Sequence, residues 1–139
     1  MKQSTEYAID TFRKFYGSET EYKTLVLGSL HNINFLYDTN IDWRTRYPIM
    51  DANFMIHDLN KGYWNLVINC CCEHMVPMRY MKLPAIYVLQ SNNHMSEYNI
   101  NELYDIEDFV KQSELDEIYY KSSIRINGKT YYTLIGEKY

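Results

Sequence analysis

The chain has 139 residues, 46% of them hydrophobic, which is enough for one core and one domain over residues 1–139 but leaves no room for a second. Its 18 acidic and 14 basic residues give a formal net charge of -4 and are mixed along the chain, so charge does not indicate a nucleic-acid-binding surface. No apolar run approaches the roughly 20 residues that span a bilayer, and the first residues are polar where a signal peptide would be apolar, so we expect a cytoplasmic protein with no membrane partner.

The first predicted element is a helix near the N-terminus. Apolar residues from Ala8 to Tyr16 recur at steps of three and four, and Gly17 follows them. This spacing is typical of an amphipathic helix. We therefore expect a helix within residues 1–17, ahead of a sheet core over residues 22–139.

A buried strand is predicted next. The run from Thr24 to Leu27 is followed by Gly28 and Ser29. Ligands of open α/β sheets bind beyond the carboxyl ends of the strands, and a glycine there lets a ligand approach the backbone. Gly28 and Ser29 are therefore candidate ligand-binding residues, and a plain turn is the alternative.

Two further short strands are predicted, at Ile33–Tyr37 and Asn53–Ile56, and residues 40–44 between them show no clear periodicity. Asp38 follows the first of these strands and could accept hydrogen bonds from ribose hydroxyls, although a solvated turn residue would look the same. Asp51 and Ala52 precede the second strand. His57 and Asp58 follow it and could contact an adenine or act as acid and base, with capping as the alternative.

The strongest strand prediction is Trp64–Cys72, which is followed by Glu73 and His74. The three contiguous cysteines, residues 70–72, suit a reducing compartment, since neighbours cannot reach disulfide geometry without distortion. A metal site is disfavoured because successive strand residues point to opposite faces. A cysteine nucleophile, acid–base use of Glu73 and His74, and packing of the cysteines as small hydrophobes remain open.

The last part of the chain predicts three elements. Ala85–Leu89 is a buried strand that ends in a polar cluster, and Asp105 can cap a helix that begins at Ile106. Asn127-Gly128 then joins two strands in a hairpin, Glu117–Ile126 and Lys129–Ile135. The order of elements predicts an α/β fold with a mostly parallel sheet and a C-terminal antiparallel hairpin.

Two segments resemble a known family. NLVINCCCEHM at residues 65–75 and PAIYVLQSNN at residues 84–93 resemble two linked motifs of small class I S-adenosylmethionine-dependent methyltransferase-like proteins of phages and bacteria. Residues 105–109 look like the short helix of that family, and residues 131–136 look like its closing strand, which typically ends in an Ile-Gly pair. The resemblance covers about residues 51–139.

The resemblance implies a reduced Rossmann-like sheet with S-adenosylmethionine bound along the strand ends, in a protein of phage origin that works in the host cytoplasm. Asn69 and the pair Glu73 and His74 would lie at the methyl-transfer end of the cofactor. Asp51 and Ala52 would lie near its adenine.

The N-terminal half departs from the family pattern, because only residues 29–34 separate Gly28 from Phe35. A crossover between parallel neighbours needs about a dozen residues, so either these strands are not parallel neighbours or the nucleotide-binding half is shortened. Two hypotheses follow. The chain is a reduced methyltransferase with an unknown acceptor, or a catalytically silent relative whose 15 Tyr and 7 Met serve in binding a protein partner or another copy of itself.

Overall fold

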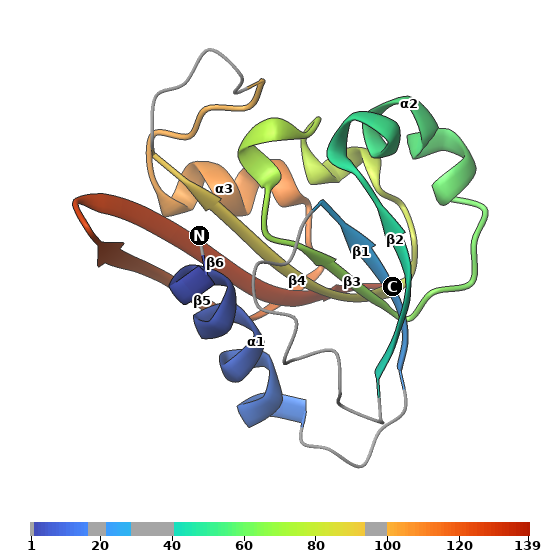
Figure 1. The fold of residues 1–139 in the computed structure, drawn as a ribbon, viewed down its shortest axis with the longest axis horizontal. Helices are drawn as coiled ribbons and strands as arrows, with labels where there is room; N and C mark the ends of the chain where they lie inside the picture. Colours follow the sequence, from blue (N-terminus) through green and yellow to red (C-terminus); the bar gives the residue numbers. More distant parts are fainter. Residues whose placement is uncertain (1, 17–21, 29–40, 94–99) are drawn as a thin grey trace.

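The computed structural model describes residues 2–16, 22–28, 41–93 and 100–139. These residues form three α-helices, two short 3₁₀ helices and six strands, which are drawn in Figure 1. The helices are α1 (Lys2–Tyr16), α2 (Ile49–Leu59), α3 (Ile106–Ser113), and the 3₁₀ helices η2 (Cys72–His74) and η3 (Met78–Tyr80). The strands are β1 (Tyr22–Leu27), β2 (Ile41–Tyr47), β3 (Leu66–Asn69), β4 (Ala85–Asn92), β5 (Glu117–Ile126) and β6 (Lys129–Lys138).

All six strands belong to one mixed sheet, in the order β2-β1-β3-β4-β6-β5. The first four strands in this order are parallel, and β6 runs antiparallel to both β4 and β5. The hairpin turns at Asn127 and Gly128, whose φ angles of 50° and 80° match a turn that needs two residues with positive φ. The prediction of an α/β protein with parallel strands and a C-terminal antiparallel hairpin is confirmed.

Two apolar clusters cover the two faces of the sheet, and helices lie on both sides of it (Figure 1). On one face, Ala8, Ile9 and Phe12 of α1 pack on side chains that include Val26 and Val88, and the Phe12 and Tyr22 rings meet edge to face at 5.5 Å. On the other face, α2, α3 and the 3₁₀ segments pack on alternate residues of the same strands. The alternation of side chains along a strand places these residues on opposite faces.

Several predicted elements have the expected position and type. The N-terminal helix, the strand at β1 and both hairpin strands are present. Asp105 caps α3 as predicted, because its Oδ1 accepts a hydrogen bond from the backbone N–H of Asp108 at 2.9 Å. The segment between Pro77 and Pro84 contains the short helix η3.

The prediction of a strand at Asn53–Ile56 is wrong, because these residues lie inside α2. Pro48 sits at the N-cap of this helix, where a residue without an N–H is tolerated. The buried residues of α2, Ala52 and Leu59, are seven positions apart and so lie on one helical face. A four-residue window is too short to reveal that period.

The strand predicted at Ile33–Tyr37 lies outside the described residues. In the described part of the chain, the strand that pairs in parallel with β1 on its outer side is β2, which begins at Ile41. Residues 28–40 connect the two strands and reach the roughly dozen residues that a parallel crossover needs. From the sequence, too few residues were expected for a parallel crossover because only residues 29–34 separate Gly28 from Phe35. That expectation does not apply to β1 and β2.

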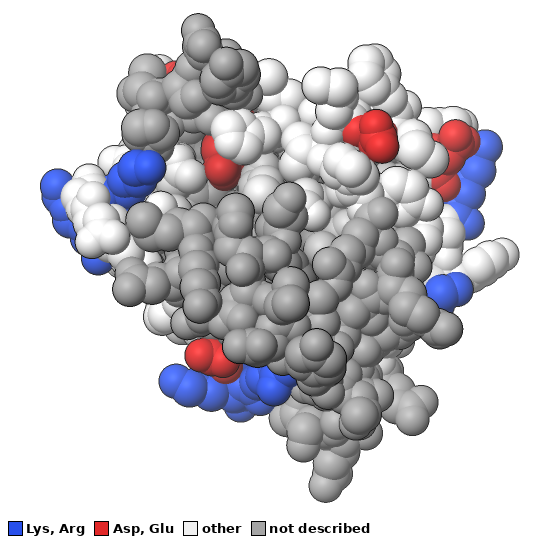
Figure 2. Space-filling view, in the orientation of Figure 1, with Lys and Arg blue, Asp and Glu red and all other residues white. Residues whose placement is uncertain are grey.

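Charged side chains of the described residues lie mainly around the periphery of the face shown in Figure 2, with both signs present. Among the described helices, none is long and apolar enough to cross a bilayer.

Candidate functional site

The strand order reverses between β1 and β3. From β1 the chain goes to β2 on one side, and it then returns past β1 to form β3 on the other side. In an open α/β sheet, the loops on either side of such a reversal run in opposite directions beyond the carboxyl ends of the strands, and they leave room for a ligand between them. The residues that follow β1 and β3 are Gly28 and residues 70–76, and they define the candidate site.

Asn69, the last residue of β3, shapes the loop after that strand. Its Oδ1 accepts a hydrogen bond from the backbone N–H of Cys71 at 2.8 Å, and its Nδ2 lies 3.2 Å from the Met75 sulfur and 3.4 Å from the Met78 sulfur. The residue is fully buried. Its polar atoms therefore hold the protein's own loop and do not face a ligand.

Asn53 of α2 fixes the other end of this loop. Its Nδ2 donates to the backbone oxygen of His74 at 3.2 Å, and its Oδ1 accepts from the backbone N–H of Val76 at 3.0 Å. The two bonds attach residues 74–76 to the helix. The sequence analysis missed Asn53, although an amide side chain within an otherwise apolar run is the signal that could have identified it.

Glu73 is the most unusual group at this edge of the sheet. Its side chain is only 9% exposed, its Oε1 lies 3.5 Å from His74 Nε2, and its Oε2 is buried without a hydrogen-bond partner in the described structure. Burial raises the pKa of this carboxyl, and a hydrogen bond from its own backbone, the neighbouring His74 and a hydrogen bond from the Asn92 side chain oppose that rise only in part. Glu73 is thus a buried acid, and one of its oxygens has no hydrogen-bond donor among the described residues.

Two residues from other strands lie close to Glu73. Asn92 of β4 and Tyr131 of β6 are partners in the sheet register. Burial of the Tyr131 hydroxyl raises its pKa, and the negative charge of Glu73 raises it further. The backbone oxygen of Glu73 also accepts from the N–H groups of Ile100 and Asn101 at 3.0 and 3.2 Å. The site therefore draws on the ends of β3, β4 and β6, and Asn92 and Tyr131 were not predicted from the sequence.

The strand predicted at Trp64–Cys72 ends earlier, at Asn69, and the cysteines lie beyond it. Cys72 is buried, its Sγ is 3.3 Å from the backbone oxygen of Asn69, and burial together with the charge of Glu73 raises its pKa well above the ordinary value. A thiol held in its protonated form is a poor nucleophile. The described residues contain no cluster of three or more His, Cys, Asp and Glu that could hold a metal ion.

Gly28 has a φ of +85°, which favours glycine, and its N–H donates to the backbone oxygen of Tyr47 at 2.8 Å. A Cβ at this position would lie 3.0 Å from Cys71 Sγ and 3.1 Å from Ile49 Cγ1. The absent side chain therefore makes room for the loop after β3 and for the start of α2. The neighbouring candidates Ser29 and Asp38 lie outside the described residues.

Asp51 and Ala52 lie in α2, which begins directly after β2 at the same edge of the sheet. Asp51 is exposed in the first turn of the helix, whereas Ala52 is fully buried in the core. The structure thus brings Gly28, Asn69, Glu73 and the half-exposed His74 to one edge. Of these groups, Glu73 has an oxygen without a hydrogen-bond partner in the described structure, and the His74 side chain is 39% exposed.

Comparison with known proteins adds no family assignment. No protein-family model matches the chain, and no curated protein sequence matches it.

Proposed function

We propose that the chain is a methyltransferase-like protein that binds S-adenosylmethionine at the carboxyl edge of its parallel strands. The observation that carries the proposal is the position of Glu73, a buried carboxyl with an unpaired oxygen in the loop after β3, beside the point at which the strand order reverses. The resemblance of residues 65–75 and 84–93 supports the same assignment, because these segments form β3, β4 and the loops that follow them.

The described residues fit this cofactor through the orphaned oxygen of Glu73. S-adenosylmethionine carries a sulfonium and an ammonium group, and both are cations that a buried carboxylate would stabilise. Asp51, exposed at the start of α2, is a second acceptor at this edge. Gly28, Ala52 and Asn69 make internal contacts, so we do not assign cofactor contacts to their side chains.

When bound, S-adenosylmethionine supplies an electrophilic methyl group. Glu73 would take the proton that the acceptor loses as it is methylated, because the positive charge of the bound cofactor favours the carboxylate form, which can accept a proton. His74 Nε2, 3.5 Å from Glu73 Oε1 and half-exposed, can pass that proton to solvent.

Isothermal titration calorimetry with S-adenosylmethionine and S-adenosylhomocysteine tests the proposal. We expect micromolar binding that is about tenfold weaker in Glu73→Gln, a loss of about 1.4 kcal/mol, and unchanged in Glu102→Gln, which removes an exposed carboxylate. The absence of heat at millimolar ligand would refute the cofactor. Equal affinities in the wild type and Glu73→Gln would refute the role of Glu73.

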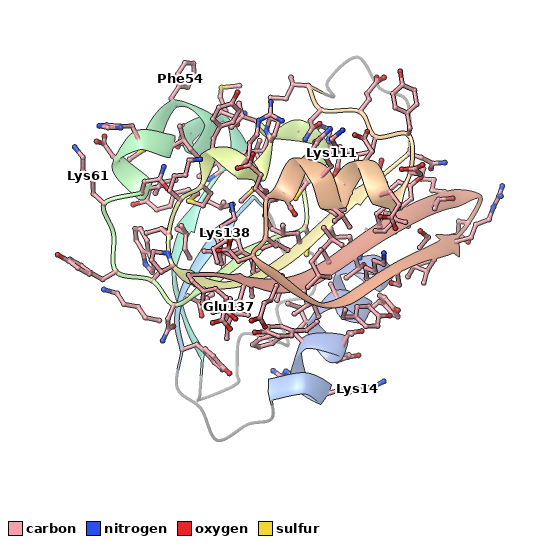
Figure 3. All side chains as sticks on the ribbon, turned by 180° about the vertical axis from the view of Figure 1, so that it is seen from behind. Lys14, Phe54, Lys61, Lys111, Glu137 and Lys138 are labelled. Atoms are coloured by element: carbon pink, nitrogen blue, oxygen red, sulfur yellow. The ribbon has the colours of Figure 1, made fainter. Side chains whose placement is uncertain are left out.

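A second candidate function is self-association through α2. Met50 and Phe54, one helical turn apart, are 72% and 85% exposed, and Phe54 points away from the molecule in Figure 3. Light scattering would show a dimer that Phe54→Glu converts to a monomer. A wild-type chain that stays monomeric as its concentration is raised would contradict this candidate.

A further inference from the structure

A pocket opens at the opposite end of the sheet from Glu73, where β1, β3 and β4 begin and β6 ends. Its volume is about 450 Å³, which lies in the range of small-molecule sites. Lys138 pairs with Ala85 at the start of β4, whereas Glu73 lies beyond the carboxyl end of β3. The pocket is therefore separate from the candidate site described above.

Aromatic and apolar side chains form much of the pocket wall. Tyr22 contributes a largely buried ring that is held in place by Phe12, and Tyr139 contributes an exposed ring. Pro84 and Ile86 add apolar surface. A wall of this kind suits a ligand with an apolar frame, and the faces of tyrosine rings attract cations.

Glu137 supplies a carboxylate to the same pocket. Its Oε1 accepts a hydrogen bond from the Tyr119 hydroxyl at 3.3 Å, and that hydroxyl lies 3.3 Å from the hydroxyl of Tyr139. None of the ion pairs found among the described residues includes Glu137. Among the described residues, the carboxylate is thus held by a neutral partner and is paired with no cation.

Lys138 also lines the pocket, but its ammonium group is engaged elsewhere. Nζ donates to the backbone oxygens of Met78 and Met81, both at 2.7 Å, and lies 5.0 Å from the centre of the Tyr87 ring. Figure 3 shows Lys138 and Glu137 on opposite sides of β6, as expected for neighbours in a strand. The lysine is therefore not available to bind an anion in the pocket.

We propose that this pocket binds an organic cation, specifically an alkylammonium group on a small apolar frame. The cation would lie against Glu137 and the face of Tyr139, and the frame would contact Pro84 and Ile86 beside the buried Tyr22. Nothing in this proposal depends on cofactor binding at the other edge of the sheet.

Choline and its neutral isostere 3,3-dimethylbutan-1-ol are suitable probes, since they differ in charge and hardly in shape. Each would be titrated into ¹⁵N-labelled protein while backbone amide shifts are followed by NMR. We expect choline to shift amides in residues 85–86 and 137–139, and the isostere to bind at least about threefold more weakly. Glu137→Gln should abolish that difference and Tyr139→Leu should reduce it, whereas Glu102→Gln should retain it.

Equal affinities for the two probes in the wild type would overturn the proposal, as would a preference for choline that survives in Glu137→Gln. An absence of choline-induced shifts at residues 85–86 and 137–139 would overturn it as well. Both substituted side chains are at least partly exposed, so the variants are expected to fold.

Discussion

Replacing Glu73 with glutamine is expected to stabilise the protein above neutral pH. The carboxyl is buried and its Oε2 has no hydrogen-bond partner in the described structure, so its charged form is poorly solvated. Burial raises its pKa above the ordinary 4.5, which means that the folded chain holds the proton more tightly than the unfolded chain. The stabilising contribution of this group is fully present below the unfolded pKa and is lost as pH rises through the folded pKa.

The magnitude follows from the buried charge. Glutamine keeps the shape of the side chain and still buries a polar atom at this position, so it removes only the cost of burying the charge, about 1–3 kcal/mol for a partly paired carboxylate. We therefore expect Glu73→Gln to raise the free energy of unfolding by about 1–3 kcal/mol near pH 8 and to change it little near pH 4.

Urea unfolding at a series of pH values would measure this difference. The wild type should lose stability as pH rises above the ordinary pKa of glutamate, and Glu73→Gln should lose less over the same interval. Glu102→Gln, at an exposed position, serves as the matched control and should follow the wild type. A destabilised Glu73→Gln near pH 8, or a pH profile parallel to that of the wild type, would refute the reasoning.

Three further outcomes are expected. Gly136→Ala places a Cβ 2.2 Å from the backbone oxygen of Glu117 and should lower the free energy of unfolding by about 1–3 kcal/mol in thermal melts; an unchanged melting temperature would mean that the hairpin adjusts freely. Asn53→Ala leaves two backbone groups of residues 74–76 without their partner and should cost about 1–3 kcal/mol in urea unfolding, whereas a loss below about 0.5 kcal/mol would show that the loop does not need this contact. Cys72 should react with a thiol reagent more slowly than the half-buried Cys71 in the native protein, as measured by mass spectrometry of digested samples, and the reverse order would contradict the assigned burial.

Elements with short-range signals could be predicted from the sequence. The hairpin at Asn127-Gly128 and the cap at Asp105 each depend on residues within a few positions of one another. Strand β2 carried a signal that was overlooked, because Ile41, Trp43 and Tyr47 alternate with charged residues at every second position. Helix α2 was mistaken for a strand because its apolar period becomes visible only over the whole of residues 49–59.

The candidate site was only partly predictable. Glu73 and His74 could be predicted as candidate site residues because several cysteine, acidic and histidine side chains follow one another directly in the sequence after β3. Asn92 and Tyr131 join them through the register of β4 and β6, and no local pattern shows which residues of separate strands lie side by side. The internal role of Asn69 depends on sulfur atoms that the fold brings around it, so position alone suggested a ligand contact.

Glu73 is proposed to be a buried acid in a ligand site. Carbon-13 NMR of its side-chain carboxyl, assigned by comparison with Glu73→Gln and followed over pH with and without S-adenosylmethionine, would measure its pKa in both states. We predict a pKa above the ordinary 4.5 in the free protein and a lower pKa once the cationic ligand is bound, because the ligand's charge favours the carboxylate. A carboxyl that titrates at its ordinary pKa, or one whose pKa does not move with the ligand, would contradict the account.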